Sequence, residues 1–161
     1  MSPPSVSLSL LDRLLDERPD QRHDAPVATA EAVGRLRRAV HRDLEALLNA
    51  RRPWRSVPAT LPALRTSPVT FGLPDFTAGA YNDRRQREML RAEIEATLRR
   101  FEPRLDDIRV HLTEDNSPLR ATLMLRIEAV LSMDPVPDPI TFDTTIDVTT
   151  ACIVLQPLRE G

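Results

Sequence analysis

An acid and an arginine flank a proline in the run Phe101-Glu102-Pro103-Arg104-Leu105, where a helical pattern ends and a strand pattern begins. Proline has no backbone N–H and keeps the preceding residue out of the helical region, so Pro103 stops the helix and makes a rigid corner. Two interpretations stay open. The corner is a plain helix stop, with Arg104 near the negative end of the helix dipole. Alternatively, it is a docking point that presents prearranged charges to a partner.

Paired carboxylates are the one enzymatic chemistry that this sequence offers. Glu102 with Asp106 or Asp107 would supply the acid and base of a glycosidase. Asp and Glu total 24 residues, however, so close pairs arise by chance, and one Trp and one Tyr provide little aromatic lining for a sugar. A peptidoglycan hydrolase of the lysozyme type is therefore an unlikely alternative, and no residue is assigned as catalytic.

The other reactive groups are absent or isolated. All 22 basic residues are arginine, which excludes a P-loop lysine and a Schiff-base lysine. His23, His41 and His111 lie far apart and there is one cysteine, so we expect no metal site and no cofactor. Cys152 lies in an apolar run without a nearby His and is expected to be a buried, inert thiol.

The elements that must position the corner follow the order of an α+β protein. Apolar residues at helical spacing predict helices over residues 29–49 and 83–101, with Asp83 as the N-cap of the second. After residue 106 the period changes to two. This predicts antiparallel strands within residues 107–112, 123–131 and 140–148, and a short one at 152–155. We therefore predict N-terminal helices packed on one face of a small C-terminal antiparallel sheet of three to four strands.

An N-terminal arm is expected over residues 1–25, before a single α+β domain over residues 26–161. The arm contains a short amphipathic helix with leucines on one side: Leu8, Leu11, Leu14 and Leu15. Such a helix is too short to be stable alone in water, so it must dock on its own domain or on a partner.

A proline-rich connection covers residues 51–82 and holds Trp54, Phe71 and Phe76. Disordered linkers rarely contain so many aromatic residues. We therefore expect an ordered loop packed over the core, with a helical turn near Leu64.

Composition limits the classes of partner. The 161 residues carry a net charge of −2, which gives no reason to expect nucleic acid or an anionic membrane as partner. No stretch approaches the roughly 18 apolar residues of a membrane helix, and the N-terminus does not resemble a signal peptide. A single cysteine fits a reducing compartment, so we expect a cytoplasmic protein without direct membrane insertion.

Six segments, read in order, resemble one family. They are SLLDRLLD (9–16), RDLEALLNARRP (42–53), FGLPDFT (71–77), FEPRL (101–105), LRIEA (125–129) and FDTTID (142–147). The set, which extends from about residue 8 to 155, resembles TssE, the baseplate wedge subunits of type VI secretion systems. That family is similar to the sheath-initiator wedge protein of contractile phage tails.

The resemblance implies a structural protein that joins wedge subunits and initiates contractile sheath assembly. Its partners would be the wedge proteins TssF and TssG, TssK through the wedge, and the sheath proteins TssB and TssC. Its location would be a cytoplasmic baseplate docked at the inner membrane. The family's Glu-Pro-Arg signature falls on Glu102, Pro103 and Arg104, so we expect these residues to bind partners, together with Leu11, Leu14 and Leu15 of the arm.

Three further expectations concern the sheet and the corner. The short last strand, at an edge, is expected to accept a strand from another chain through backbone hydrogen bonds. The family often has Thr-Gly where this chain has Thr150-Ala151, so a turn that needs a positive φ would suit Ala151 poorly. Alanine at Glu102 or Arg104 is expected to leave the monomer folded and to weaken assembly, whereas a large loss of thermal stability would favour the helix stop.

Overall fold

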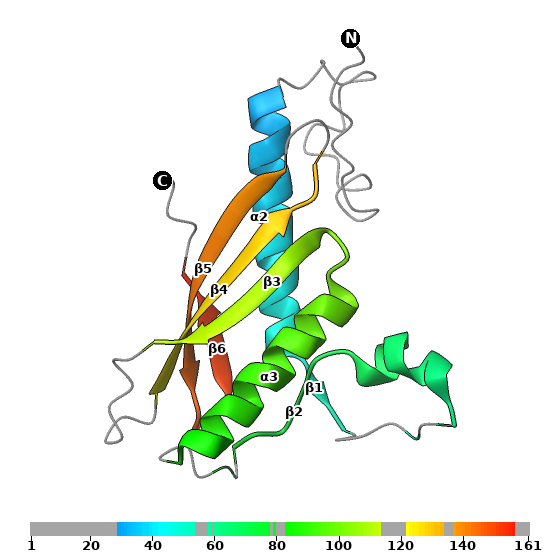
Figure 1. Cartoon of the computed structure of the whole chain (residues 1–161), viewed down its shortest axis with the longest axis vertical. Coiled ribbons are helices and arrows are strands. Elements are labelled where there is room, and N and C mark those ends of the chain that lie inside the picture. The colour runs from blue at the N-terminus through cyan, green and yellow to red at the C-terminus, as the bar shows by residue number, and fades with distance from the viewer. Residues whose placement is uncertain are drawn as a thin grey trace, which may run out of the picture.

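The computed structural model describes residues 29–53, 58, 60–77, 79, 83–113, 122–133 and 137–156. The predicted arm, with Leu11, Leu14 and Leu15, lies outside these residues. Within them, two long helices precede the strands of the main sheet (Figure 1). These helices are α2 (Thr29–Asn49) and α3 (Arg84–Phe101), as the apolar spacing predicted. The Asp83 carboxylate caps α3 by accepting a hydrogen bond from the Arg85 N–H at 2.9 Å.

The main sheet has four antiparallel strands in the order β3-β4-β5-β6, so each strand pairs with the next one along the chain. Their bounds are β3 (Leu105–Leu112), β4 (Thr122–Leu131), β5 (Asp138–Asp147) and β6 (Cys152–Leu155). Side chains alternate between the two faces, and those of one face are buried, including Ile127 and Phe142 at 0% exposure. The α+β class and the half-buried sheet predicted from the sequence are confirmed.

Both helices cover the same face of this sheet. Val40 and Leu44 of α2, and Ile94 and Leu98 of α3, belong to one apolar core with the inward residues of the strands. On β4, which lies inside the sheet, Met124, Arg126 and Glu128 instead point to the opposite, exposed face. The apolar stripes of the two helices therefore pack against the buried face of the sheet. This packing holds α3, and the corner at its C-terminal end, against β3.

The connection between the helices differs from its prediction. Two short parallel strands, β1 (Arg51–Arg52) and β2 (Leu73–Pro74), close its base, and Leu73 and Phe76 join the core. Between them, residues 60–71 extend to one side of the molecule and do not cover the core (Figure 1). The helical turn near Leu64 is confirmed as the 3-10 helix η1 (Pro62–Thr66), which is followed by η2 (Pro68–Thr70). Trp54 lies outside the described residues.

Two features at β6 concern residues for which the sequence made a prediction, Cys152 and Ala151. Cys152 is exposed, so the prediction of a buried thiol was wrong. The reason is the period of the strand: Ile153 and Leu155 point into the core, which turns Cys152 and Val154 outwards. The preceding turn does place Ala151 at a positive φ of 55°, a conformation that a residue with a Cβ adopts at a cost.

Candidate partner-binding site

The predicted corner forms where α3 ends. The Glu102 N–H donates to the Leu98 carbonyl at 2.9 Å and completes the last helical turn. Pro103 is exposed, and the chain enters β3 at Leu105, whose N–H returns to the Glu102 carbonyl at 3.2 Å. The three predicted residues Glu102, Pro103 and Arg104 thus lie in one turn, held from both sides by backbone hydrogen bonds.

Glu102 and Arg104 bind each other through two parallel hydrogen bonds. Arg104 donates from Nε to Glu102 Oε1 and from Nη2 to Oε2, both at 2.6 Å. Its Nη2 also donates to Oδ2 of Asp43 on α2 at 2.8 Å. The Glu102 side chain is 5% exposed and that of Arg104 21%. The hydrogen bond with Glu102 raises the pKa of Arg104 above its ordinary value, burial opposes this, and Asp43 adds to the rise.

This ion pair changes what the corner presents to solvent. The Glu102 carboxylate faces inward and is neutralised by Arg104, whose Nη1 is itself buried. The accessible surface of the corner is therefore Pro103 and the exposed 21% of the Arg104 side chain. The arrangement ties the end of α3 and the start of β3 to α2. Sequence reasoning missed Asp43, because nothing in the pattern distinguished it from other charged residues beside the apolar stripe of α2.

Next to the corner lies the base of the connection between the helices. The Phe71 ring packs edge-on against Phe101, with centroids 5.4 Å apart and planes at 72°. Arg52, 8% exposed, forms an ion pair with Glu93 of α3. The Arg51 guanidinium lies 4.8 Å from the centroid of the Phe76 ring. The corner and the base of residues 60–71 therefore belong to one contiguous part of the molecule.

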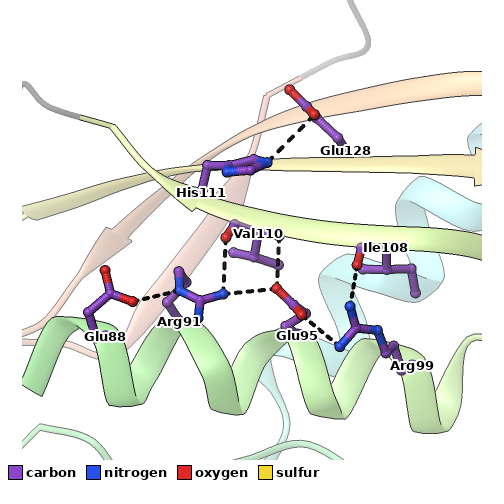
Figure 2. A network of polar contacts seen from close by, with 8 residues as sticks. All are labelled: Glu88, Arg91, Glu95, Arg99, Ile108, Val110, His111 and Glu128. Carbon is purple, nitrogen blue, oxygen red and sulfur yellow. Dashed lines mark hydrogen bonds and ion pairs between the residues drawn. The ribbon is translucent and has the colours of Figure 1, made fainter.

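The outer edge of β3 is bonded by side chains from α3 (Figure 2). Glu95 accepts from the Val110 N–H at 3.2 Å, and Arg91 donates to the Val110 carbonyl at 3.3 Å. Arg99 donates to the Ile108 carbonyl at 2.8 Å. These backbone groups are the ones that an additional strand would use, so α3 closes this edge of the sheet.

Glu95 is the centre of this network. Its carboxylate lies 2.9 Å from Arg91 Nη1 and 2.6 Å from Arg99 Nη1. Burial alone would raise the pKa of Glu95. The hydrogen bond from Val110 and the charges of Arg99 and Arg91 outweigh burial, so the pKa of Glu95 is lowered overall.

The opposite edge, β6, receives hydrogen bonds from Asn49 of α2, and Arg51 of β1 bonds the residue just before this strand. The Asn49 side chain donates to the Ile153 carbonyl at 2.8 Å and accepts from the Ile153 N–H at 3.0 Å. Arg51 donates to the Ala151 carbonyl. The last strand therefore lies at an edge of the sheet, as expected, and a side chain of the same molecule already bonds its central residue. Acceptance of a strand from another chain stays a prediction.

Enzymatic chemistry finds no support in the described parts of the chain. The Glu102 carboxylate is bound by Arg104, and Asp106 accepts a hydrogen bond from the Ser132 hydroxyl. No group of His, Cys, Asp and Glu suited to a metal ion occurs among the described residues. None of the described helices is long and apolar enough to span a membrane.

One comparison with known proteins gives a match. A family model described as baseplate wedge protein gp25 matches residues 34–136, from α2 through β4. The matched region contains the corner, the connection between the helices and the α3–β3 network, whereas β5 and β6 follow it. No curated protein and no solved structure matches the chain.

Proposed function

Because this chain belongs to the baseplate wedge protein gp25 family, we propose that it serves as the TssE-type wedge subunit of a type VI secretion baseplate. In this role it joins wedge subunits and initiates the contractile sheath, and it acts by binding rather than by catalysis. The family match supports the wedge role. The ordered motifs of the sequence, including arm and strand segments outside the match, support the secretion-system assignment.

The observation that carries the wedge role is the rigid corner at residues 102–104. A bidentate ion pair holds the guanidinium of Arg104 in place, and Pro103 stands exposed beside it. A partner that docks here meets a surface with little conformational freedom to lose, which lowers the cost of binding. We assign this corner to contact with TssF and TssG, and with TssK through the wedge, in a cytoplasmic baseplate docked at the inner membrane. Leu11, Leu14 and Leu15 of the arm are proposed as a second contact.

Sheath initiation is assigned to the β6 edge. An incoming strand from TssB or TssC would form the backbone hydrogen bonds that Asn49 now makes with Ile153. The β3 edge is a poorer acceptor, because an incoming strand would have to displace Arg91, Glu95 and Arg99 together.

Co-purification with the products of neighbouring genes tests the proposal. The tagged chain should recover TssF and TssG, and Arg104→Ala should recover much less of both. Arg37→Ala is the matched control, because Arg37 forms a comparable bidentate ion pair with Asp138 of β5, at 2.8 Å for both bonds. An equal loss of wedge-protein recovery in the two variants would mean that the corner contributes to folding and not to binding. Recovery of no wedge protein by the unchanged chain, with those proteins expressed, would overturn the proposed function.

A further inference from the structure

The loop formed by residues 60–71 stands apart from the core (Figure 1). None of the residues in η1 is buried, and Thr70 is the buried residue of η2. Three large apolar side chains of this loop are exposed: Leu61 at 51%, Val69 at 49% and Phe71 at 39%. They account for half of the six exposed large apolar residues in the described chain, so apolar surface is concentrated here.

The loop is well ordered by its own hydrogen bonds. The Thr70 hydroxyl lies 2.9 to 3.0 Å from the carbonyls of Leu64, Arg65 and Ser67. The Ser67 hydroxyl donates to Leu64 at 3.0 Å, and prolines begin both 3-10 turns. The hydroxyls of Thr70 and Ser67 are therefore satisfied before any partner arrives, and an apolar environment would cost these two groups little.

The base of the loop fixes its direction. Gly72 has a φ of +94°, and a Cβ there would lie 2.4 Å from the Ala50 carbonyl oxygen. That close approach allows the Leu73 N–H to bond the same carbonyl at 3.0 Å and start the β1–β2 pair. Phe71 then contacts Phe101, the residue next to the corner. The loop is thus held in a set position beside the 102–104 corner.

The loop carries only positive charge. Residues 60–71 contain no Asp or Glu, and their one charged residue is Arg65, which is exposed. A surface of this kind is complementary to an apolar groove that has an acidic residue at its rim. Such a groove also matches the general anatomy of protein interfaces, in which apolar contacts are central and charges lie at the edge.

We propose that the 60–71 loop inserts into an apolar groove with an acidic rim on the wedge partner that contacts the 102–104 corner. Leu61 and Val69 fill the groove, Phe71 continues the contact towards Pro103, and Arg65 pairs with the rim. This inference rests on the proposed function and extends its site from one corner to a two-part surface. The loop pays little ordering cost on binding because its conformation is already fixed.

A pair of matched valine variants tests the proposal. Val69 and Val154 are both 49% exposed, but Val154 lies on β6, on the exposed face of the sheet. Val69→Ser should lower the recovery of wedge proteins, and adding Leu61→Ser should bring the loss to about tenfold, as expected for central apolar contacts. Val154→Ser should leave the recovery of wedge proteins unchanged, because β6 is assigned to the sheath proteins and not to the wedge contact. Neither variant should change the melting temperature by more than about 2 °C, because exposed side chains contribute little to stability.

Arg65→Glu tests independently whether Arg65 pairs with an acidic residue at the rim of the groove. It should weaken recovery more at low salt than at high salt, because the rim interaction is electrostatic. A photo-crosslinking residue at Val69 should attach to a wedge protein, whereas one at Val154 should not. If the unchanged chain recovers wedge proteins but the loop variants do so equally well, the loop proposal is wrong and the wedge function stands. Crosslinking of Val69 to a second copy of the same chain would also overturn it.

Discussion

The Asn49 side chain bonds both backbone groups of Ile153, as an adjacent strand would, with distances of 2.8 and 3.0 Å. Asn49 is the last residue of α2, so the end of the helix acts as a one-residue cover on the edge of the sheet. Exposed edges of this kind promote pairing between chains, and proteins commonly protect them.

Removing this cover should have two measurable effects. Asn49→Ala should lower the free energy of unfolding by about 1 to 2 kcal/mol, because two hydrogen bonds are lost at an edge that water can reach. It should also increase self-association, measured by sedimentation velocity over a concentration series. Asn49→Asp retains an acceptor for the Ile153 N–H but loses the donor, and should fall between. A strictly monomeric Asn49→Ala protein would show that the edge needs no cover.

Single substitutions at the Glu102–Arg104 pair should be strongly destabilising, contrary to the expectation from sequence. Glu102→Ala leaves Arg104 without its main partner, and Arg104→Ala leaves a carboxylate that is 5% exposed without a counter-charge. Each should cost about 3 to 5 kcal/mol, as for other buried ion pairs. The double variant Glu102→Met with Arg104→Met should be within about 1 kcal/mol of the original chain. Urea denaturation of all three proteins would measure the coupling.

That double variant also separates folding from docking. If it is stable yet recovers no wedge protein, the charges of the corner serve binding. If it is stable and recovers wedge proteins normally, the pair serves the fold alone, and Arg104 should be removed from the proposed site.

The sequence predicted the helices and strands well because each is encoded by a local period of apolar residues. It placed Glu102, Pro103 and Arg104 in one turn for the same reason, since Pro103 acts on its immediate neighbours. It did not reveal that Glu102 faces inward or that Arg104 also bonds Asp43, because Asp43 is distant in sequence and has no local signature. The covers on the two sheet edges were missed likewise, since Asn49 and Glu95 resemble ordinary polar residues of a helix surface.

Gly34 and Gly72 should respond in opposite ways to alanine. Gly72→Ala places a Cβ 2.4 Å from a backbone oxygen at a positive φ and should cost more than about 2 kcal/mol. Gly34→Ala on α2 has 3.5 Å to its nearest neighbour, Arg38 Nη1, and should gain about 0.5 to 1 kcal/mol from helix propensity. Thermal unfolding compares them directly. A neutral Gly72→Ala would contradict the tight β1–β2 base.

Ala151 offers a stabilising change. It adopts a φ of 55° after a turn in which Asp147 accepts from the Thr149 and Thr150 N–H groups, at 2.8 and 3.2 Å. Ala151→Gly should raise the free energy of unfolding by about 0.5 kcal/mol, because relief of the backbone strain exceeds the loss of one methyl group. Ala129→Gly, in the interior of β4, should instead lower it. A loss of stability in Ala151→Gly would mean that the buried methyl matters more than the strain.

Acid should weaken the α3–β3 edge through Glu95. Its pKa is lowered in the folded protein, so its contribution is present above the unfolded value of about 4.3 and is lost as pH falls through the lower, folded value. Glu95→Gln should therefore reduce stability at neutral pH and flatten its dependence on pH below about 4.5. Glu31→Gln, which removes an exposed ion pair with Arg35, should change the free energy of unfolding at neutral pH by less than about 1 kcal/mol. Parallel pH profiles for Glu95→Gln and the original chain would contradict this assignment.

The bond between Asn49 and Ile153 also has a consequence for synthesis on the ribosome. Its two residues are separated by 104 positions, so α2 leaves the ribosome long before β6 exists. At about 5 to 20 residues per second, the interval is about 5 to 20 s. During this interval the apolar stripe of α2 is not yet covered by β6. By contrast, α3 and the strands that follow it pair with elements that are near in sequence and are made soon after. The nascent chain therefore depends on its first described helix staying unaggregated until its last strand is made.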